Sequence, residues 1–256
     1  MGAPSRLTRR EFGVMAAGAV ASLAMAGSCE GEPQPGNDGF VAARPRAGVR
    51  TTGSGSRTLG LGGARDALFQ LPAKHSDAAL PLLVLLHGAG GGGNGILRRL
   101  GSLVDEARIA VLAPDSRDSS WDVIRGGLGP DVTFINRALE RVFESTAIDP
   151  ARVSIGGFSD GASYALTLGL MNGELFRRIV AWSPGFIAPG AARGRPRVFV
   201  SHGTRDEILP IDRCSRVLVP QLQRLGYNVT FREFAGGHTV PPDLAREGLR
   251  WAAGQP

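Results

Sequence analysis

The pentapeptide Gly157-Phe158-Ser159-Asp160-Gly161 places a serine between two glycines. It directly follows an apolar run over residues 153–156 that predicts a strand, and it opens a predicted helix over residues 161–171. In a strand–turn–helix of this kind the serine lies on a sharp turn with its hydroxyl exposed, and the N-terminus of the helix favours negative charge beside it. An ordinary turn between a strand and a helix can carry the same five residues, so the motif alone makes Ser159 a candidate nucleophile.

A serine nucleophile needs a base to take its proton and an acid to orient that base. His238 follows the last predicted strand, and Asp206 lies in a short turn after the strand before it. Glu207 and Asp212 are competing acids, but Asp206 is nearest to the end of its strand. The order Ser159, Asp206, His238, each beyond a different strand, indicates a Ser-His-Asp triad.

Strands and helices alternate through the last two hundred residues. Apolar runs predict strands over residues 58–61, 67–71, 82–86, 109–113, 153–156, 179–182, 198–201 and 229–234. Helical spacing predicts helices over residues 96–107, 132–142, 161–171, 212–225 and 242–252, with Asp131 placed to cap the second. This alternation predicts an α/β fold, a mostly parallel central sheet with helices on both faces and no large lid domain. Ligands bind such sheets at the carboxyl ends of the strands, where the candidate triad lies.

Residues 1–28 have the pattern of an export signal. Arg9 and Arg10 before Phe12 resemble a twin-arginine motif, and the apolar stretch over residues 12–27 is shorter than the roughly twenty residues of a spanning helix. Small residues precede Cys29, as in a lipoprotein signal. We therefore expect lipidation of Cys29, with conventional cleavage of the leader as the alternative.

Residues 29–57 are rich in Gly, Pro, Ser, Thr and Arg, with almost no large apolar side chains. This composition predicts a flexible linker. The linker would join a membrane tether at Cys29 to a catalytic domain over residues 58–256. The expected location is outside the cytoplasm, either periplasmic or at a membrane as a lipoprotein.

Charge and cysteine content exclude several other classes of protein. The net charge is +6, but the 29 basic residues, all arginine except Lys74, are scattered among acidic ones, which argues against nucleic acid as a partner. Two cysteines cannot form a disulfide framework, and Cys214 lies on the apolar face of a predicted helix, where it is expected in the core. No Cys/His cluster has zinc spacing. We expect neither a metal nor a cofactor.

The glycine-rich loop over residues 87–93 allows a second interpretation. Residues 88–93 satisfy the G-x-G-x-x-G pattern of a dinucleotide site between a strand and a helix, and Asp105 and Asp115 follow at an approximate distance. The helix begins late, however, and neither aspartate clearly ends a second strand. A nucleotide site would also leave the Ser-Asp-His order unexplained. The hydrolase interpretation is therefore favoured.

Four segments together resemble the α/β-hydrolase superfamily. They are Leu85-Leu86-His87-Gly88-Ala89-Gly90, Gly157-Phe158-Ser159-Asp160-Gly161, His202-Gly203-Thr204-Arg205-Asp206-Glu207-Ile208-Leu209-Pro210 and Gly236-Gly237-His238. Over roughly residues 58–254 the chain is most similar to the phospholipase/carboxylesterase family, with polyhydroxybutyrate-depolymerase-like and feruloyl-esterase-like esterases nearby. The motifs are specific for the mechanism and loose for the substrate.

The resemblance implies roles for individual residues. Ser159 would be the nucleophile, His238 the base and Asp206 the acid. The backbone N–H groups of Ala89 or Gly90, and of Asp160, would form the oxyanion hole. His87 and His202 are expected to brace the loops that carry these groups.

The expected substrate pocket lies in the loops after the strands. Its candidate walls are Trp121, Phe158, Trp182, Phe186 and Leu209, each of which could equally be core or loop packing. The carboxylate at position 160, where many relatives have an uncharged residue, would disfavour anionic substrates unless it points away from the site.

The sequence thus predicts a serine hydrolase that cleaves small-molecule or polymeric carboxylic esters through an acyl-enzyme intermediate. A non-catalytic binding module on the same scaffold is the alternative from another class, because a fold does not guarantee an activity. A thioesterase or a peptidase could use the same triad.

Overall fold

The computed structural model describes residues 11–12 and 39–255. Its main sheet has eight strands in the order β10-β9-β7-β6-β4-β5-β3-β2. The bounds of these strands are Ser56–Thr58 (β2), Ala67–Gln70 (β3), Leu80–Leu86 (β4), Ala110–Pro114 (β5), Ile148–Phe158 (β6), Arg178–Trp182 (β7), Arg197–Gly203 (β9) and Val229–Phe234 (β10). Strands β4, β5, β6, β7, β9 and β10 pair in parallel, whereas β3 is antiparallel to β5 and to β2. Two short strands, β1 (Glu11–Phe12) and β8 (Gly190–Ala191), pair antiparallel to each other.

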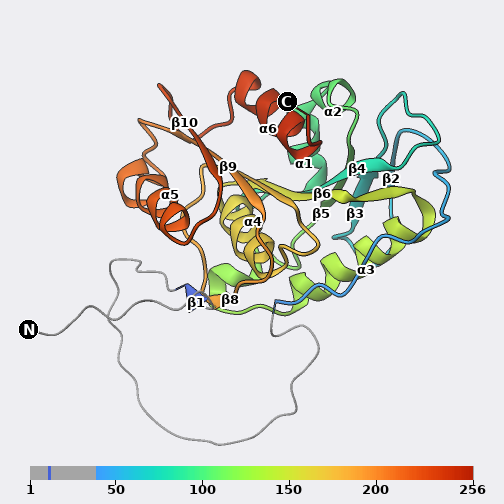
Figure 1. Cartoon of the computed structure of the whole chain (residues 1–256), viewed down its shortest axis with the longest axis horizontal. Coiled ribbons are helices and arrows are strands. Elements are labelled where there is room, and N and C mark those ends of the chain that lie inside the picture. Colours follow the sequence, from blue (N-terminus) through green and yellow to red (C-terminus); the bar gives the residue numbers. More distant parts are fainter. Residues whose placement is uncertain (1–10, 13–38, 256) are drawn as a thin grey trace, which may run out of the picture.

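Helices cover both faces of the sheet (Figure 1). The helices are α1 (Gly93–Leu100), α2 (Leu103–Glu106), α3 (Pro130–Ser145), α4 (Asp160–Met171), α5 (Ser215–Arg224) and α6 (Pro242–Ala252), with short 3-10 turns η1 (Asp122–Arg125) and η2 (Ile211–Arg213). Side chains of β4 alternate between two cores. Leu82, Val84 and Leu86 pack with α3, α4 and α5, whereas Leu83 and Leu85 pack with α1, α2 and α6. The predicted fold class is confirmed.

Two local expectations need correction. The predicted helix over residues 96–107 is two helices, because Gly101 adopts φ 51° after α1 and breaks the helical path. Asp131 does not cap α3, which begins at Pro130 after Gly129. Its buried carboxylate instead accepts the N–H of Arg117 at 2.6 Å and of Asp122 at 2.7 Å. Asp131 therefore organises the loop before α3.

The beginning of the linker segment that the structure describes is packed on the domain, which corrects the expected flexibility at residues 41–43. Val41 is fully buried, and the side chain of Asn172 accepts its N–H at 2.8 Å. The side chain of Asn136 accepts the N–H groups of Ala42 and Ala43 at 2.8 and 2.9 Å. These asparagines supply the partners that the extended backbone lacks.

The predicted signal over residues 1–28 lies outside the described residues except for β1, and Cys29 lies outside them altogether. Within the described residues, none of the helices has the length and apolar character needed to span a membrane.

Candidate active site

Ser159 lies on a strained turn between β6 and α4. Its backbone has φ 59° and ψ −122°, in a region that non-glycine residues rarely adopt, and its N–H donates to the carbonyl of Trp182 at 3.0 Å. The flanking glycines are required by close backbone contacts. A Cβ on Gly157 would lie 2.4 Å from the carbonyl oxygen of Gly161, and one on Gly161 would lie 2.3 Å from that of Leu86. The turn therefore holds Ser159 in one fixed position.

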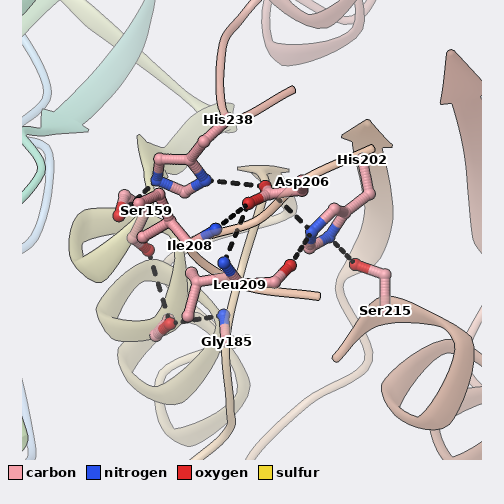
Figure 2. A network of polar contacts seen from close by, with 9 residues as sticks. Ser159, Gly185, His202, Asp206, Ile208, Leu209, Ser215 and His238 are labelled. Atoms are coloured by element: carbon pink, nitrogen blue, oxygen red, sulfur yellow. Dashed lines mark hydrogen bonds and ion pairs between the residues drawn. The ribbon is translucent and has the colours of Figure 1, made fainter. Parts of the chain in front are cut away.

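Ser159, His238 and Asp206 form one hydrogen-bonded chain (Figure 2). His238 Nε2 lies 2.9 Å from Ser159 Oγ, and His238 Nδ1 lies 2.7 Å from Asp206 Oδ2. Since the carboxylate accepts the Nδ1 proton, Nε2 is left to accept the proton of the serine hydroxyl. The Asp206 side chain is fully buried, whereas 15% of the His238 side chain is exposed.

Asp206 is held as a carboxylate by several donors. Its Oδ1 accepts the N–H groups of Ile208 at 3.0 Å and Leu209 at 2.8 Å, while Oδ2 faces His238. Burial alone would raise the pKa of Asp206, but the hydrogen bonds from Leu209 and His238 outweigh it and lower that pKa. Asp206 therefore stays ionised at neutral pH.

His202 supports Asp206 from behind, at the end of β9. Its Nε2 lies 2.7 Å from the carbonyl oxygen of Leu209 and 3.2 Å from Asp206 Oδ2, and its Nδ1 lies 2.7 Å from Ser215 Oγ. A carbonyl can only accept, so Nε2 carries the proton and Nδ1 accepts the Ser215 hydroxyl. Burial lowers the pKa of His202, which is therefore neutral. As expected, this histidine braces the turn that bears Asp206.

The competing acids lie elsewhere. Asp212 forms an exposed ion pair with Arg216 at 2.7 Å, and Glu207 is exposed. Of the three candidate carboxylates, Asp206 is the one that contacts His238.

The glycine-rich loop after β4 lies against Ser159. A Cβ on Gly88 would be 3.3 Å from Ser159 Cβ. The N–H of Gly90 donates to the carbonyl of Ser119 at 2.7 Å, which removes Gly90 from the expected oxyanion donors. The N–H groups of Ala89 and Asp160 have no acceptor among the described residues. Of the expected oxyanion donors, the N–H groups of Ala89 and Asp160 therefore remain free.

His87 and Trp121 hold this loop in place. His87 Nδ1 donates to the carbonyl of Gly88 at 2.7 Å, and its Nε2 accepts the N–H of Ser116 at 3.0 Å. Burial lowers the pKa of His87, consistent with a neutral ring. Trp121 is fully buried, donates its indole N–H to the carbonyl of His87 at 2.8 Å and stacks on Tyr164. Trp121 is thus a loop support, and its expected place in the pocket wall is wrong.

The carboxylate of Asp160 is turned toward the loop after β5, because its Oδ2 accepts the hydroxyl of Ser120 at 2.6 Å. This contact leaves the backbone N–H of Asp160 at the start of α4 as the part of the residue available beside Ser159.

Two cavities share Ile96, Arg99 and Phe158 in their linings. One, of about 150 Å³, lies along the glycine-rich loop and is lined by His87, Gly88, Ala89, Gly91, Gly92, Gly95, Ile96, Arg99 and Phe158. The other, of about 270 Å³, is lined by Ile96, Arg99, Leu100, Leu103, Phe158, Trp182, Thr239, Val240, Pro242 and Ala245. The centre of the Phe158 ring lies 4.7 Å from that of the His238 ring. A residue that lines both cavities is therefore in contact with His238.

Phe158 and Trp182 thus occupy the predicted pocket, whereas Phe186 and Leu209 line neither cavity. Phe186 packs against the core, and Leu209 contacts the backbone at Gly185, where a Cβ would lie 3.2 Å from its side chain. Sequence reasoning missed Arg99, on α1. Ile96 and Leu100 on that helix belong to the core and also line a cavity, and no sequence pattern separates the two roles.

Cys214 is buried in the core, as expected, and burial raises the pKa of its thiol. Within the described part of the chain, no three His, Cys, Asp or Glu side chains form a group that could hold a metal ion.

The parallel sheet, the strained serine after β6 and the Ser-Asp-His order define the α/β-hydrolase fold. A family model described as Phospholipase/Carboxylesterase matches residues 132–246. This match confirms the predicted resemblance to the family over these residues, and solved structures of similar fold include esterases.

Individual relatives are distant. Acyl-protein thioesterase 1 of Gibberella zeae is 29% identical over 120 residues, which are 43% of this chain and 50% of the relative. The chain spans about half the length of the curated relatives it matches. The structure of esterase PE8 has a TM-score of 0.59 at 23% identity, over 72% of this chain and 95% of that one. The carboxylesterase of Bacillus cereus has a TM-score of 0.58 at 22% identity, over 76% and 96%. At these identities, the structural likeness concerns the fold.

Proposed function

We propose that this protein is a serine hydrolase that cleaves carboxylic esters through an acyl-enzyme intermediate. The observation that carries the proposal is the unbroken hydrogen-bond chain from Ser159 Oγ through His238 to the ionised Asp206. It lies beside two free backbone amides and opens toward apolar cavities. The family match over residues 132–246 supports the same chemistry.

Acylation follows from this arrangement. Ser159 Oγ attacks the ester carbonyl carbon while His238 Nε2 takes the hydroxyl proton. The carbonyl oxygen becomes an oxyanion, which accepts hydrogen bonds from the N–H groups of Ala89 and Asp160. Each such donor is worth roughly 3–4 kcal/mol of barrier in well-studied enzymes. The C–O bond to the alcohol then breaks, and His238 returns the proton to the departing oxygen.

Deacylation repeats these steps with water. His238 takes a proton from a water molecule as the water oxygen attacks the acyl carbon, and the bond from that carbon to Ser159 Oγ breaks. The proton goes back to the serine oxygen, which releases the carboxylic acid and restores the enzyme. Asp206 orients the imidazole and stabilises its positive charge throughout, without accepting the proton itself.

The test is hydrolysis of a 4-nitrophenyl ester series of increasing acyl length, extended to feruloyl and polyester substrates. Wild-type protein should hydrolyse part of this series, and Ser159→Ala should abolish turnover with an unchanged circular dichroism spectrum. A folded wild-type protein that hydrolyses no member would favour the non-catalytic binding module.

Thioesters are a second candidate substrate class, because one similar protein is named acyl-protein thioesterase. Thioesters react through the same acyl-enzyme, with a thiol as leaving group. Comparing kcat/KM for an oxygen ester and a thioester of the same acid decides between them.

We also propose that the protein is exported by a twin-arginine signal and held at a membrane by a lipid on Cys29. The support is Arg9-Arg10, the short apolar stretch after them and the small residues before the cysteine. Intact-mass analysis of the mature chain should find an acylated Cys29 at its N-terminus. A chain that retains Met1, or one that begins upstream of Cys29 without lipid, would contradict this proposal.

A further inference from the structure

We propose that the preferred ester carries a carboxylate at the far end of an apolar segment, and that Arg99 binds this carboxylate. This inference rests on the proposed esterase function and deepens it, since it assigns a substrate class to the site. Arg99 would be a specificity-determining residue that takes no part in the chemical steps.

The position of Arg99 is the first support. Arg99, Ile96 and Phe158 line both cavities, so Arg99 lies on the boundary between them. The smaller cavity includes Ala89, whose free N–H is the proposed oxyanion donor. An ester whose carbonyl oxygen binds the N–H of Ala89 would therefore extend along this cavity toward Arg99.

The larger cavity that Arg99 lines is mainly apolar. Leu100, Leu103, Trp182 and Val240 line the larger cavity, and its volume of about 270 Å³ accepts a hydrocarbon segment. A mainly apolar wall with one charged side chain matches a ligand that is apolar along its length and charged at one end.

Charge is the second support. Arg99 is the one charged side chain among the residues that line these two cavities, since His87 is held neutral by its hydrogen bonds. Within the described residues Arg99 has no ion-pair partner or hydrogen bond. A planar guanidinium that no protein carboxylate occupies is suited to a carboxylate of the substrate.

The nearby acidic residues do not oppose this assignment. The carboxylate of Asp160 is bound by the Ser120 hydroxyl and lines neither cavity. Asp115 accepts the N–H of Gly93 at 2.7 Å, at the opposite end of α1 from Arg99. Both carboxylates are therefore engaged by other groups. We expect the carboxylate of Asp160 not to repel the anionic end of the substrate.

Helix geometry alone would explain an arginine here, because cations favour the last turn of a helix. Arg98 meets that preference equally well on the same turn and lines neither cavity. Arg98→Gln and Arg99→Gln are therefore matched variants. Each removes one positive charge from the last turn of α1, but of the two residues it is Arg99 that lines the cavities.

The experiment compares two esters of equal chain length, 4-nitrophenyl hexanoate and mono-4-nitrophenyl adipate, which differ by one terminal carboxylate. Wild-type protein should show a higher kcat/KM for the adipate ester. Arg99→Gln should reduce kcat/KM for the adipate ester about five- to tenfold, the effect of one charge-assisted contact to a side chain that is exposed in the free protein, and leave the hexanoate ester nearly unchanged. Arg98→Gln should keep the wild-type ratio.

A second pair places the carboxylate on the alcohol half, in the hexanoate esters of 4-methylphenol and of 4-hydroxyphenylacetate. Loss of preference in Arg99→Gln on either pair supports the proposal and tells which half carries the anion. The proposal is wrong if Arg99→Gln changes charged and neutral esters equally, if it changes neither, or if Arg98→Gln has the same effect.

Binding to the full-length Ser159→Ala protein separates this inference from the proposed function. Calorimetry should show that monomethyl adipate binds more tightly than methyl hexanoate, and that the difference disappears when Arg99→Gln is added. This measurement needs no turnover, so a protein without esterase activity can still confirm or contradict the anion site. Equal affinities for the two ligands in Ser159→Ala would contradict it.

Discussion

Replacing His202 by glutamine tests how much the group behind Asp206 contributes. The wild-type side chain is fully buried and joins Leu209, Asp206 and Ser215. Glutamine can keep an N–H donor close to the position of Nε2, but it provides no acceptor at the position of Nδ1. The Ser215 hydroxyl is then left buried without its partner, and we expect a loss of about 1–3 kcal/mol in the free energy of unfolding.

The effect on activity should be smaller than that of removing the acid itself. Asp206 keeps three donors in this variant, the N–H groups of Ile208 and Leu209 and the ring of His238. We therefore expect kcat/KM to fall about tenfold, against the thousand- to ten-thousand-fold loss typical of a missing triad acid.

The same variant changes the pH dependence of stability in a defined direction. Burial lowers the pKa values of His202 and His87, so the unfolded chain binds protons that the folded chain does not as pH falls below about 6.5. The two histidines make their full contribution to the free energy of unfolding above that pH, and this contribution is lost progressively below it. Each histidine contributes a slope of up to about 1.4 kcal/mol per pH unit, and His202→Gln removes one of the two contributions.

Urea unfolding of both proteins, across the range from about pH 7.5 to 5.5 around the ordinary histidine value, gives these slopes. The slope of the variant should be shallower by up to about 1.4 kcal/mol per pH unit. Equal slopes would show that His202 is not held neutral. A loss of activity as large as that of Asp206→Asn would show that it does more than position the turn.

Two further predictions concern the acid and the nucleophile turn. Asp206→Asn should lower kcat about ten-thousand-fold with little change in melting temperature, whereas Asp212→Asn, in an exposed ion pair, should stay within a few-fold of wild type; equal losses would mean that the acid is misassigned. Gly161→Ala should destabilise the fold by about 3 kcal/mol or more in urea unfolding, because its Cβ would lie 2.3 Å from the carbonyl oxygen of Leu86. Gly127→Ala meets open space and should be nearly neutral, so similar losses in the two variants would contradict the packing argument.

The sequence predicted the features that local chemistry determines. The serine turn between its glycines, the alternation of strands and helices, and the choice of Asp206 over Asp212 all depended on spacing relative to strand ends. The structure brings Ser159, Asp206 and His238 together because parallel strands end at one edge of the sheet.

Features that depend on distant contacts could not be predicted. Trp121 looks the same in sequence whether it packs inward under His87 or faces a substrate. The packing of residues 41–43 depends on the side chains of Asn136 and Asn172, which lie 93 to 131 positions away along the chain. Composition indicated a linker because it records few large apolar residues, but hydrogen bonds to those two asparagines hold the backbone.

The oxyanion loop shows the same limit at finer scale. Ala89 and Gly90 are adjacent and equally plausible donors in the sequence. The carbonyl of Ser119, contributed by the loop after β5, engages Gly90 and leaves Ala89 free. A contact between two loops thus determines which of the two N–H groups is free, and the spacing of residues in the sequence does not predict that contact.

Covalent labelling with a fluorophosphonate, followed by peptide mass mapping, tests the central claim most directly. The probe should form a single adduct on Ser159, because His238 activates that hydroxyl at 2.9 Å. Labelling should disappear in Ser159→Ala, slow strongly in His238→Gln and persist in Ser119→Ala, which removes an exposed hydroxyl nearby. An adduct on another residue, or undiminished labelling of Ser159→Ala, would contradict the assignment of Ser159 as the nucleophile.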